Sequence, residues 1–252
     1  MLSQAIAVAC AMLRGLGRGL GRASTRAGRR LYQMYLRPMD MFEEVKAEPD
    51  ASGAALLLIA AFAAQTAVAA AVFSGIFVSS AGSSISLLEG FFSNLTVYVS
   101  VRGAALFVFW FILFIVFWFV MYLFGSRVEG FTVFSATGYI LSSQLATFLA
   151  TFAVYIAASR SIPALVLVGV AGTYPQYVML AAHFFRLESL HPAVPVLLDA
   201  IGYFGTAWNV MLTALMFKVI GDLNWKRASA GTAIAVGASW LLARVFRMAG
   251  ML

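Results

Sequence analysis

The chain has few of the residues from which soluble enzymes build their active sites. Of its 252 residues, one is cysteine, Cys10, and two are histidine, His183 and His191. A single cysteine excludes an intrachain disulfide and a thiolate metal site made by this chain alone. The histidines show no metal-ligand spacing with another His, Cys, Asp or Glu, so we expect no bound metal. No Gly-rich phosphate loop, nucleophile elbow or zinc-protease motif occurs, which predicts a protein without cofactor or enzymatic activity.

Charged residues are also scarce. Only 11% of the positions are Asp, Glu, Lys or Arg, while 62% are hydrophobic. A soluble globular domain carries roughly a quarter charged residues and about half apolar ones. The charges that exist gather in the first fifty residues and in short clusters between apolar runs. This composition predicts an integral membrane protein.

Long apolar runs dominate the rest of the chain. A membrane-spanning helix needs roughly 20 mostly apolar residues, and five runs meet that requirement. A sixth run, 164–185, is interrupted by Pro175, so it either spans the membrane or forms a re-entrant pair of half-helices. We therefore predict an all-α, polytopic transmembrane helical bundle with five to six spans. The five runs are residues 54–79, 104–124, 132–158, 194–220 and 228–244.

The N-terminal region is basic and lacks acidic residues as far as position 39. Five of its arginines follow one another at a spacing of four, which on a helix forms one basic stripe. Such a stripe suits a helix bound to anionic lipid head groups, whereas nothing in it indicates nucleic-acid binding. A disordered basic tail and an organellar transit peptide stay open as alternatives, and we expect no cleaved secretory signal. The stripe consists of Arg14, Arg18, Arg22, Arg26 and Arg30.

The chain thus divides into two parts. Residues 1–50 form a basic amphipathic region that ends in an interfacial lead-in helix, and residues 51–252 form the transmembrane domain. The excess of basic residues before the first span predicts a cytoplasmic N-terminus. The side of the C-terminus stays open, because it depends on whether the run that contains Pro175 crosses the membrane.

Polar residues inside the apolar runs are the candidates for function. A carboxylate within the membrane is costly and marks a possible functional site, so Asp199 attracts attention, with Gln176 and Asn209 as possible neighbours along a polar path. The alternative interpretation places Asp199 at the membrane interface, near the start of its helix, where the helix dipole favours an anion. Lys218 lies nineteen residues further along the chain, nearly 30 Å away on a helix, and does not pair with Asp199.

Three short stretches carry a family resemblance. Residues 35–45 read YLRPMDMFEEV and are followed by Pro49; residues 125–131 read GSRVEGF and are followed by Gly138 and Tyr139. The third stretch contains Asp199, Phe204, Trp208 and residues 221–227. Together these stretches resemble the Yip-domain family of membrane proteins, especially its bacterial and archaeal branch. The family usually has a proline soon after the Gly-Tyr pair, where this chain has Ser142 and Ser143, which leaves a kink at that point open.

The resemblance implies a non-enzymatic membrane protein of about five spans. Eukaryotic relatives act in vesicle traffic and membrane shaping and bind small GTPases, but this chain lacks the long acidic cytoplasmic domain used for that binding. We therefore expect a role in membrane organisation, trafficking or assembly, with anionic lipids and a membrane-protein partner or a second copy of the chain as partners. A small transporter or permease subunit with a polar path near Asp199 and Pro175 is the alternative, and an intramembrane enzyme is a third reading.

Overall fold

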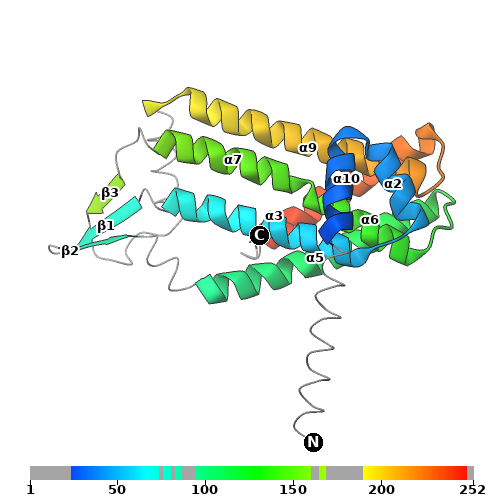
Figure 1. The fold of residues 1–252 in the computed structure, drawn as a ribbon, viewed down its shortest axis with the longest axis horizontal. Coiled ribbons are helices and arrows are strands. Elements are labelled where there is room, and N and C mark those ends of the chain that lie inside the picture. Colours follow the sequence, from blue (N-terminus) through cyan, green and yellow to red (C-terminus); the bar gives the residue numbers. More distant parts are fainter. Residues whose placement is uncertain are drawn as a thin grey trace, which may run out of the picture.

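The computed structural model describes residues 24–73, 76–80, 83–86, 95–159, 165–168 and 190–248. Long helices run side by side, two shorter helices lie across one end of them, and a small sheet lies at the other end (Figure 1). Residues 24–36 form the first described helix. The elements that follow are α2 (Pro38–Ala47), α3 (Ala51–Phe73), β1 (Ile76–Ser80), β2 (Ser83–Ser86), α5 (Leu95–Leu123), α6 (Gly130–Ser142), α7 (Gln144–Ser159), β3 (Leu165–Val168), α9 (Ala193–Val219) and α10 (Trp225–Met248).

Five helical segments among the described residues are long and apolar enough to cross a bilayer. Helix α5 illustrates why, since it buries Phe117 while Phe111 and Phe119 on the same helix are more than half exposed. A helix that is apolar on every side is suited to lipid on its outer face. The predicted polytopic helical bundle is therefore confirmed. The five segments are Ala51–Val72, Leu95–Leu123, Gly130–Ala158, Ala193–Val219 and Trp225–Phe246.

The small sheet corrects two of the expected spans. Strand β1 pairs antiparallel with β2 and parallel with β3, so that Val78 lies opposite Ile85 on one side and Leu167 on the other. The first span therefore ends before β1 and does not reach residue 79. The run 164–185 begins with strand β3, so it is not one continuous helix; its Pro175 lies outside the described residues. Apolar β-branched residues in short runs suit a strand as well as a helix, which hydropathy alone does not distinguish.

The ends of α7 and α9 decide how the chain crosses the bundle. Helix α7 ends and α9 begins at the end of the bundle that carries the sheet (Figure 1). The chain therefore leaves α7 and enters α9 at the same end of the bundle, and the five helical passes alternate in direction. The turn of residues 220–224 then lies at the end covered by α2, where the Lys46 Nζ donates to the carbonyl oxygen of Val219 at 3.1 Å.

A break at Ser143 divides the third span into α6 and α7. The hydroxyl groups of Thr137 and Ser142 donate to the carbonyl oxygens of Val133 and Tyr139 on the preceding turn. Hydroxyl groups that bond back to the preceding turn bend helices. The break falls at the pair Ser142 and Ser143, where the sequence left a kink open.

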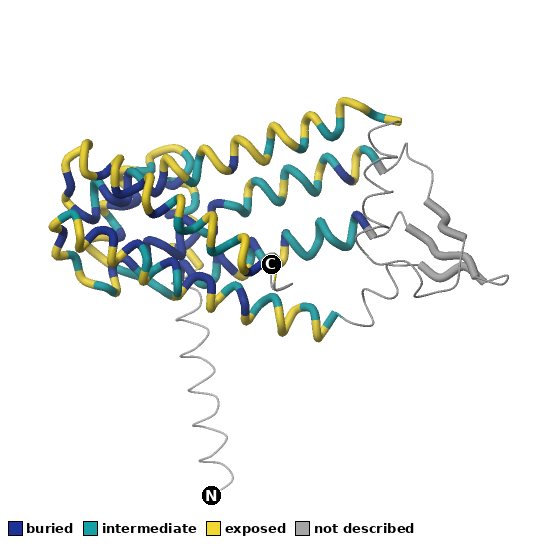
Figure 2. Tube along the Cα trace, turned by 180° about the vertical axis from the view of Figure 1, so that it is seen from behind, coloured by how far each residue is buried: buried dark blue, intermediate teal, exposed yellow. Residues whose placement is uncertain are grey.

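The tightest packing lies in the half of the bundle next to α2. Figure 2 shows the buried segments gathered at that end, whereas the helices become mostly half-buried or exposed toward the sheet. The ring of Trp110 stacks on Phe134 with centroids 4.2 Å apart, and its Nε1 donates to the Phe134 carbonyl oxygen at 3.0 Å. A rigid core at this end gives the N-terminal helices a fixed surface on which to pack.

Candidate functional site at the N-terminal end of the bundle

The helix of residues 24–36 and α2 form a cover on the end of the bundle, called the N-terminal platform below. On the first helix, Ala27, Arg30 and Met34 are buried, a spacing that places them on one face. The second helix buries Met41, Phe42 and Val45. The break between them is local, because Pro38 disfavours helical geometry at Arg37 and then begins α2 at its first position. The predicted interfacial lead-in helix therefore packs against the protein with its apolar face.

Arg30 is the central polar residue of the platform, with a side chain that is 0% exposed. Its Nε donates to the Glu44 Oε1 at 2.9 Å, its Nη2 to the Glu48 carbonyl oxygen at 2.8 Å and its Nη1 to the Tyr139 hydroxyl at 3.2 Å. One guanidinium thus joins the first helix to the end of α2 and to α6. Buried charges are tolerated when paired and hydrogen-bonded in this way.

Two carboxylates surround this guanidinium. Glu44 also accepts a hydrogen bond from the Arg29 Nη2 at 2.5 Å, and the Asp50 Oδ2 lies 3.9 Å from the Arg30 Nη1. Burial raises the pKa of Glu44, but hydrogen bonds from Arg29 and Arg30 outweigh burial and hold this pKa below its usual value. The network therefore keeps Glu44 ionised as the partner of Arg30.

Asp50 connects the network to the first span. Its Oδ1 accepts hydrogen bonds from the backbone N–H groups of Ser52 and Gly53 at 3.0 and 3.1 Å, so it caps the start of α3. Burial raises the pKa of Asp50, but the hydrogen bonds from Ser52 and Gly53 and the charge of Arg30 lower it below its usual value. Arg30 is thus linked to α2 within the platform, and to the start of α3 and to α6 in the bundle.

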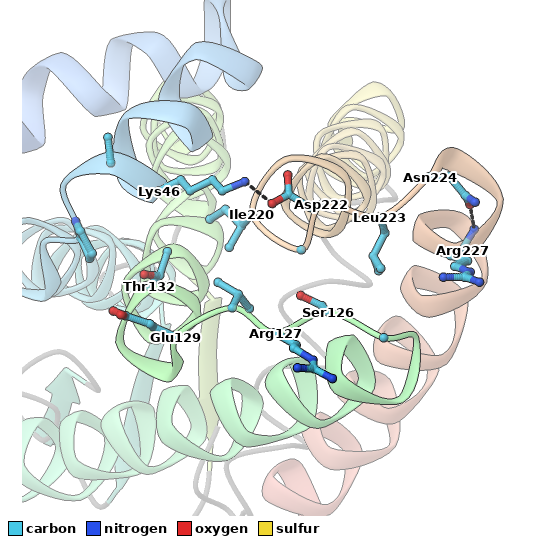
Figure 3. A pocket seen from close by; sticks show the side chains of 15 residues that line it. Lys46, Ser126, Arg127, Glu129, Thr132, Ile220, Asp222, Leu223, Asn224 and Arg227 are labelled. Atoms are coloured by element: carbon cyan, nitrogen blue, oxygen red, sulfur yellow. Dashed lines mark hydrogen bonds and ion pairs between the residues drawn. The ribbon is translucent and has the colours of Figure 1, made fainter.

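A polar pocket of about 740 Å³ lies beside the platform. It is bordered by the end of α2, the turn between α5 and α6 and the turn between α9 and α10 (Figure 3). The Lys46 Nζ lies 2.6 Å from the Asp222 Oδ2, joining α2 to the second turn. Gly125 begins the first turn with a φ of +89°, which glycine adopts without strain. Basic residues reach the pocket from all three segments: Lys46, Arg127 and Arg227.

Of the three predicted polar residues of the membrane, the structure describes Asp199 and Asn209 and places them apart. Asp199 is exposed on the second turn of α9. Asn209, ten residues or about 15 Å further along that helix, accepts a hydrogen bond from the Ser143 hydroxyl at 2.7 Å. Gln176 lies outside the described residues. Asn209 therefore has a packing contact with the break between α6 and α7, separate from Asp199.

The predicted basic stripe is described only in part, because Arg14, Arg18 and Arg22 lie outside the described residues. Arg26 is exposed and lies 3.7 Å from the Glu48 carboxylate. Arg30 departs from the expectation of a lipid-facing residue, because its guanidinium points into the protein and is fully bonded there. The sequence contained a signal for this, since Arg30 shares the face of Ala27 and Met34.

Comparison with known proteins adds the family. The Yip1 domain matches residues 32–245, which includes α2, the pocket and the five candidate spans except for the last residue of the fifth. No curated protein and no solved structure matches the chain. The matched stretch covers most of the sequence, so the chain belongs to the Yip1-domain family.

Proposed function

We propose that this chain acts without catalysis, organising the membrane or assembling with other membrane proteins through its N-terminal platform. Proteins of the Yip1-domain family are membrane proteins involved in trafficking, and the platform is the part of this chain that we assign to assembly. The observation that carries the proposal is the Arg30 network, which holds the platform in one position on the bundle. A surface that is already ordered loses less conformational entropy when it binds.

The outer face of the platform has the composition of an interaction surface. Tyr32 and Leu36 are 64% and 62% exposed, one helical turn apart, and Met39 follows on α2. Arg29 and Arg37 are exposed beside them. Large apolar residues outside the spans that stay exposed mark contacts with protein or with the membrane surface. Anionic head groups and a membrane-protein partner, or a second copy of the chain, are the partners that fit this surface.

We infer that the platform faces the cytoplasm. Lys226 and Arg227, at the start of α10, lie at the same end as the platform, and basic residues in short loops are retained inside. In a Cys10→Ser background, an impermeant maleimide is expected to label Leu190→Cys on intact cells, because Leu190 is exposed just before α9 at the sheet end. Lys226→Cys is expected to react only after permeabilisation. The reverse pattern would overturn the orientation.

The assembly role is tested by purifying the tagged chain in mild detergent and quantifying co-purifying proteins by mass spectrometry. The wild type is expected to carry a partner or a second copy in stoichiometric amount. In the Tyr32→Ser/Leu36→Ser variant, the amount of co-purifying partner per chain is expected to fall at least about tenfold, since apolar anchors contribute most of an interface's binding energy. Asp199→Asn is the matched control and is expected to retain the partner. A wild-type chain that purifies alone would overturn the proposal.

The alternative function, a small transporter or permease subunit, requires a polar path through the membrane. Asn209 is bonded to Ser143 and Asp199 lies exposed elsewhere on α9, while Pro175 and Gln176 lie outside the described residues. No observation on the described part of the chain favours the alternative. Substrate flux in liposomes that is lost in Asp199→Asn would support it.

A further inference from the structure

We propose that the polar pocket between α2, the α5–α6 turn and the α9–α10 turn binds the phosphate of an anionic lipid head group, with Arg127 and Arg227 as its ligands. The proposal concerns a lipid site and does not depend on the assembly role assigned to the platform. It rests on the position of the pocket, on the charges that line it and on its dimensions.

The pocket lies where the spans end. One of its turns connects Leu123 to Gly130, and the other connects Val219 to Trp225. Each of these four residues is the first or last residue of a candidate span. Tyr122 and Trp225, at two of these ends, are 67% and 53% exposed. Tyrosine and tryptophan are enriched at the level of the lipid head groups. The pocket therefore lies at the depth of the lipid head groups, and a lipid can place its head group there while its chains stay in the membrane.

The charges in the pocket leave two cations available. Lys46 is engaged by Asp222. By contrast, Arg127 and Arg227 have no carboxylate at ion-pair distance in the part of the chain that the structure describes, and both are exposed. The Arg227 Nη1 donates a long hydrogen bond to the Phe124 carbonyl oxygen, at 3.5 Å, while its backbone N–H donates to the Asn224 Oδ1. Glu129, the other carboxylate of the lining, lies near Thr132 and away from Arg227 (Figure 3).

Guanidinium groups match phosphate particularly well. Each presents a planar fork of N–H donors that binds two phosphate oxygens at once, and an exposed ammonium group does not reproduce this geometry. Ser126 and Thr132, both buried, also line the pocket and carry hydroxyl groups. About 740 Å³ is within the range of small-ligand pockets and is large enough for a phosphorylated head group.

The chain offers a matched control for these arginines. Lys226 precedes Arg227, is exposed and carries the same charge, yet it does not line the pocket. A site-specific contact distinguishes Arg227 from Lys226, whereas general attraction to anionic lipid treats both alike.

The test measures binding of dioctanoyl phosphatidic acid, dioctanoyl phosphatidylcholine and inorganic phosphate to the full chain in a non-ionic detergent, by native mass spectrometry and calorimetry. The wild type is expected to prefer the phosphatidic acid over the phosphatidylcholine by about tenfold or more, since hydrogen bonds to charged groups are among the stronger ones. Arg127→Gln/Arg227→Gln is expected to abolish this preference, and Lys226→Gln to change it less than about twofold. Inorganic phosphate is expected to bind more weakly than the lipid.

Each arm of the test has an outcome that contradicts the proposal. Equal binding of the two lipids, or equal losses in the double variant and Lys226→Gln, would overturn the site. Inorganic phosphate that binds as tightly as the phosphatidic acid would overturn the lipid as its source. If the double glutamine variant does not fold, Arg127→Lys/Arg227→Lys keeps both charges and is expected to weaken binding by about tenfold through loss of the forks; unchanged binding there would likewise overturn the assignment.

Discussion

Replacing Arg30 by methionine is expected to destabilise the folded protein by about 3–5 kcal/mol, the usual cost of removing one partner from a buried, paired charge. Methionine fills much of the space but leaves Glu44, the Glu48 carbonyl oxygen and the Tyr139 hydroxyl without their common donor. Unfolding of the detergent-solubilised chain, followed by denaturant titration, measures the loss. The platform is expected to detach first. Limited proteolysis detects this as faster cleavage within residues 24–36.

Arg29 supplies the control for this prediction. It bonds to the same Glu44 oxygen, but its side chain is 57% exposed, and exposed ion pairs contribute about 0–1 kcal/mol. Arg29→Met is therefore expected to change stability little. Arg30→Met/Glu44→Leu is expected to recover part of the loss, because it also removes the carboxylate that has lost its buried partner and keeps only the exposed Arg29. Equal effects of the Arg29 and Arg30 variants would show that the buried network does not hold the platform.

A second large effect is expected from Gly138→Ala on α6. A Cβ atom there would lie 2.5 and 2.7 Å from two atoms of the Trp110 ring and 2.9 Å from the Ala54 Cβ. The Trp110 ring is held between its stack on Phe134 and a hydrogen bond to the same residue, so it has little freedom to yield. Inserting a methyl group into such a core costs roughly 1–3 kcal/mol or more. The expected result is a lower unfolding midpoint and separation of α3, α5 and α6.

Gly202→Ala on α9 is the matched substitution. No atom lies within 4 Å of a Cβ at Gly202, and alanine favours a helix over glycine by about 1 kcal/mol. This variant is expected to be neutral or slightly more stable in the same denaturant titration. A Gly138→Ala variant as stable as Gly202→Ala would mean that the three helices are not in contact at this point.

These two effects concern the same end of the molecule. Tyr139, the neighbour of Gly138, carries the hydroxyl that Arg30 contacts. The packing of α3, α5 and α6 therefore sets the position of the residue to which the platform is bonded. A loss of packing at Gly138 is expected to loosen the platform too.

Most of the architecture was predictable from composition and hydropathy. The five spans agree with the apolar runs to within a few residues, with two exceptions. Helix α5 begins nine residues earlier than expected, and α3 ends before β1, short of the expected end at residue 79. The membrane explains this success, because every spanning backbone group needs a hydrogen bond within its own helix and the required length is fixed by the bilayer. Outside the apolar layer that constraint ends, and the small sheet was not predicted.

The candidate site was much less predictable. The spacing of the arginines predicts that Arg30 belongs to a lipid-facing stripe, yet Arg30 shares the buried face of Ala27 and Met34 and lies inside the protein. Its partners Glu44 and Tyr139 are 14 and 109 residues away in the sequence. Likewise, no spacing in the sequence connects Lys46 with Asp222, 176 residues apart. Contacts of this kind depend on how helices are placed relative to one another.

The sequence by itself determined the class of the protein, its family, the presence of five spans and most of the residues at which they begin and end, because hydropathy and short motifs are local properties. Only the tertiary structure decided that the run with Pro175 begins as a strand, that α7 and α9 meet at one end, and that the basic N-terminal helix is fastened to the bundle by a buried guanidinium. The physical reason is that the energy of a buried charge depends on partners brought by distant segments, and hydropathy carries no information about them.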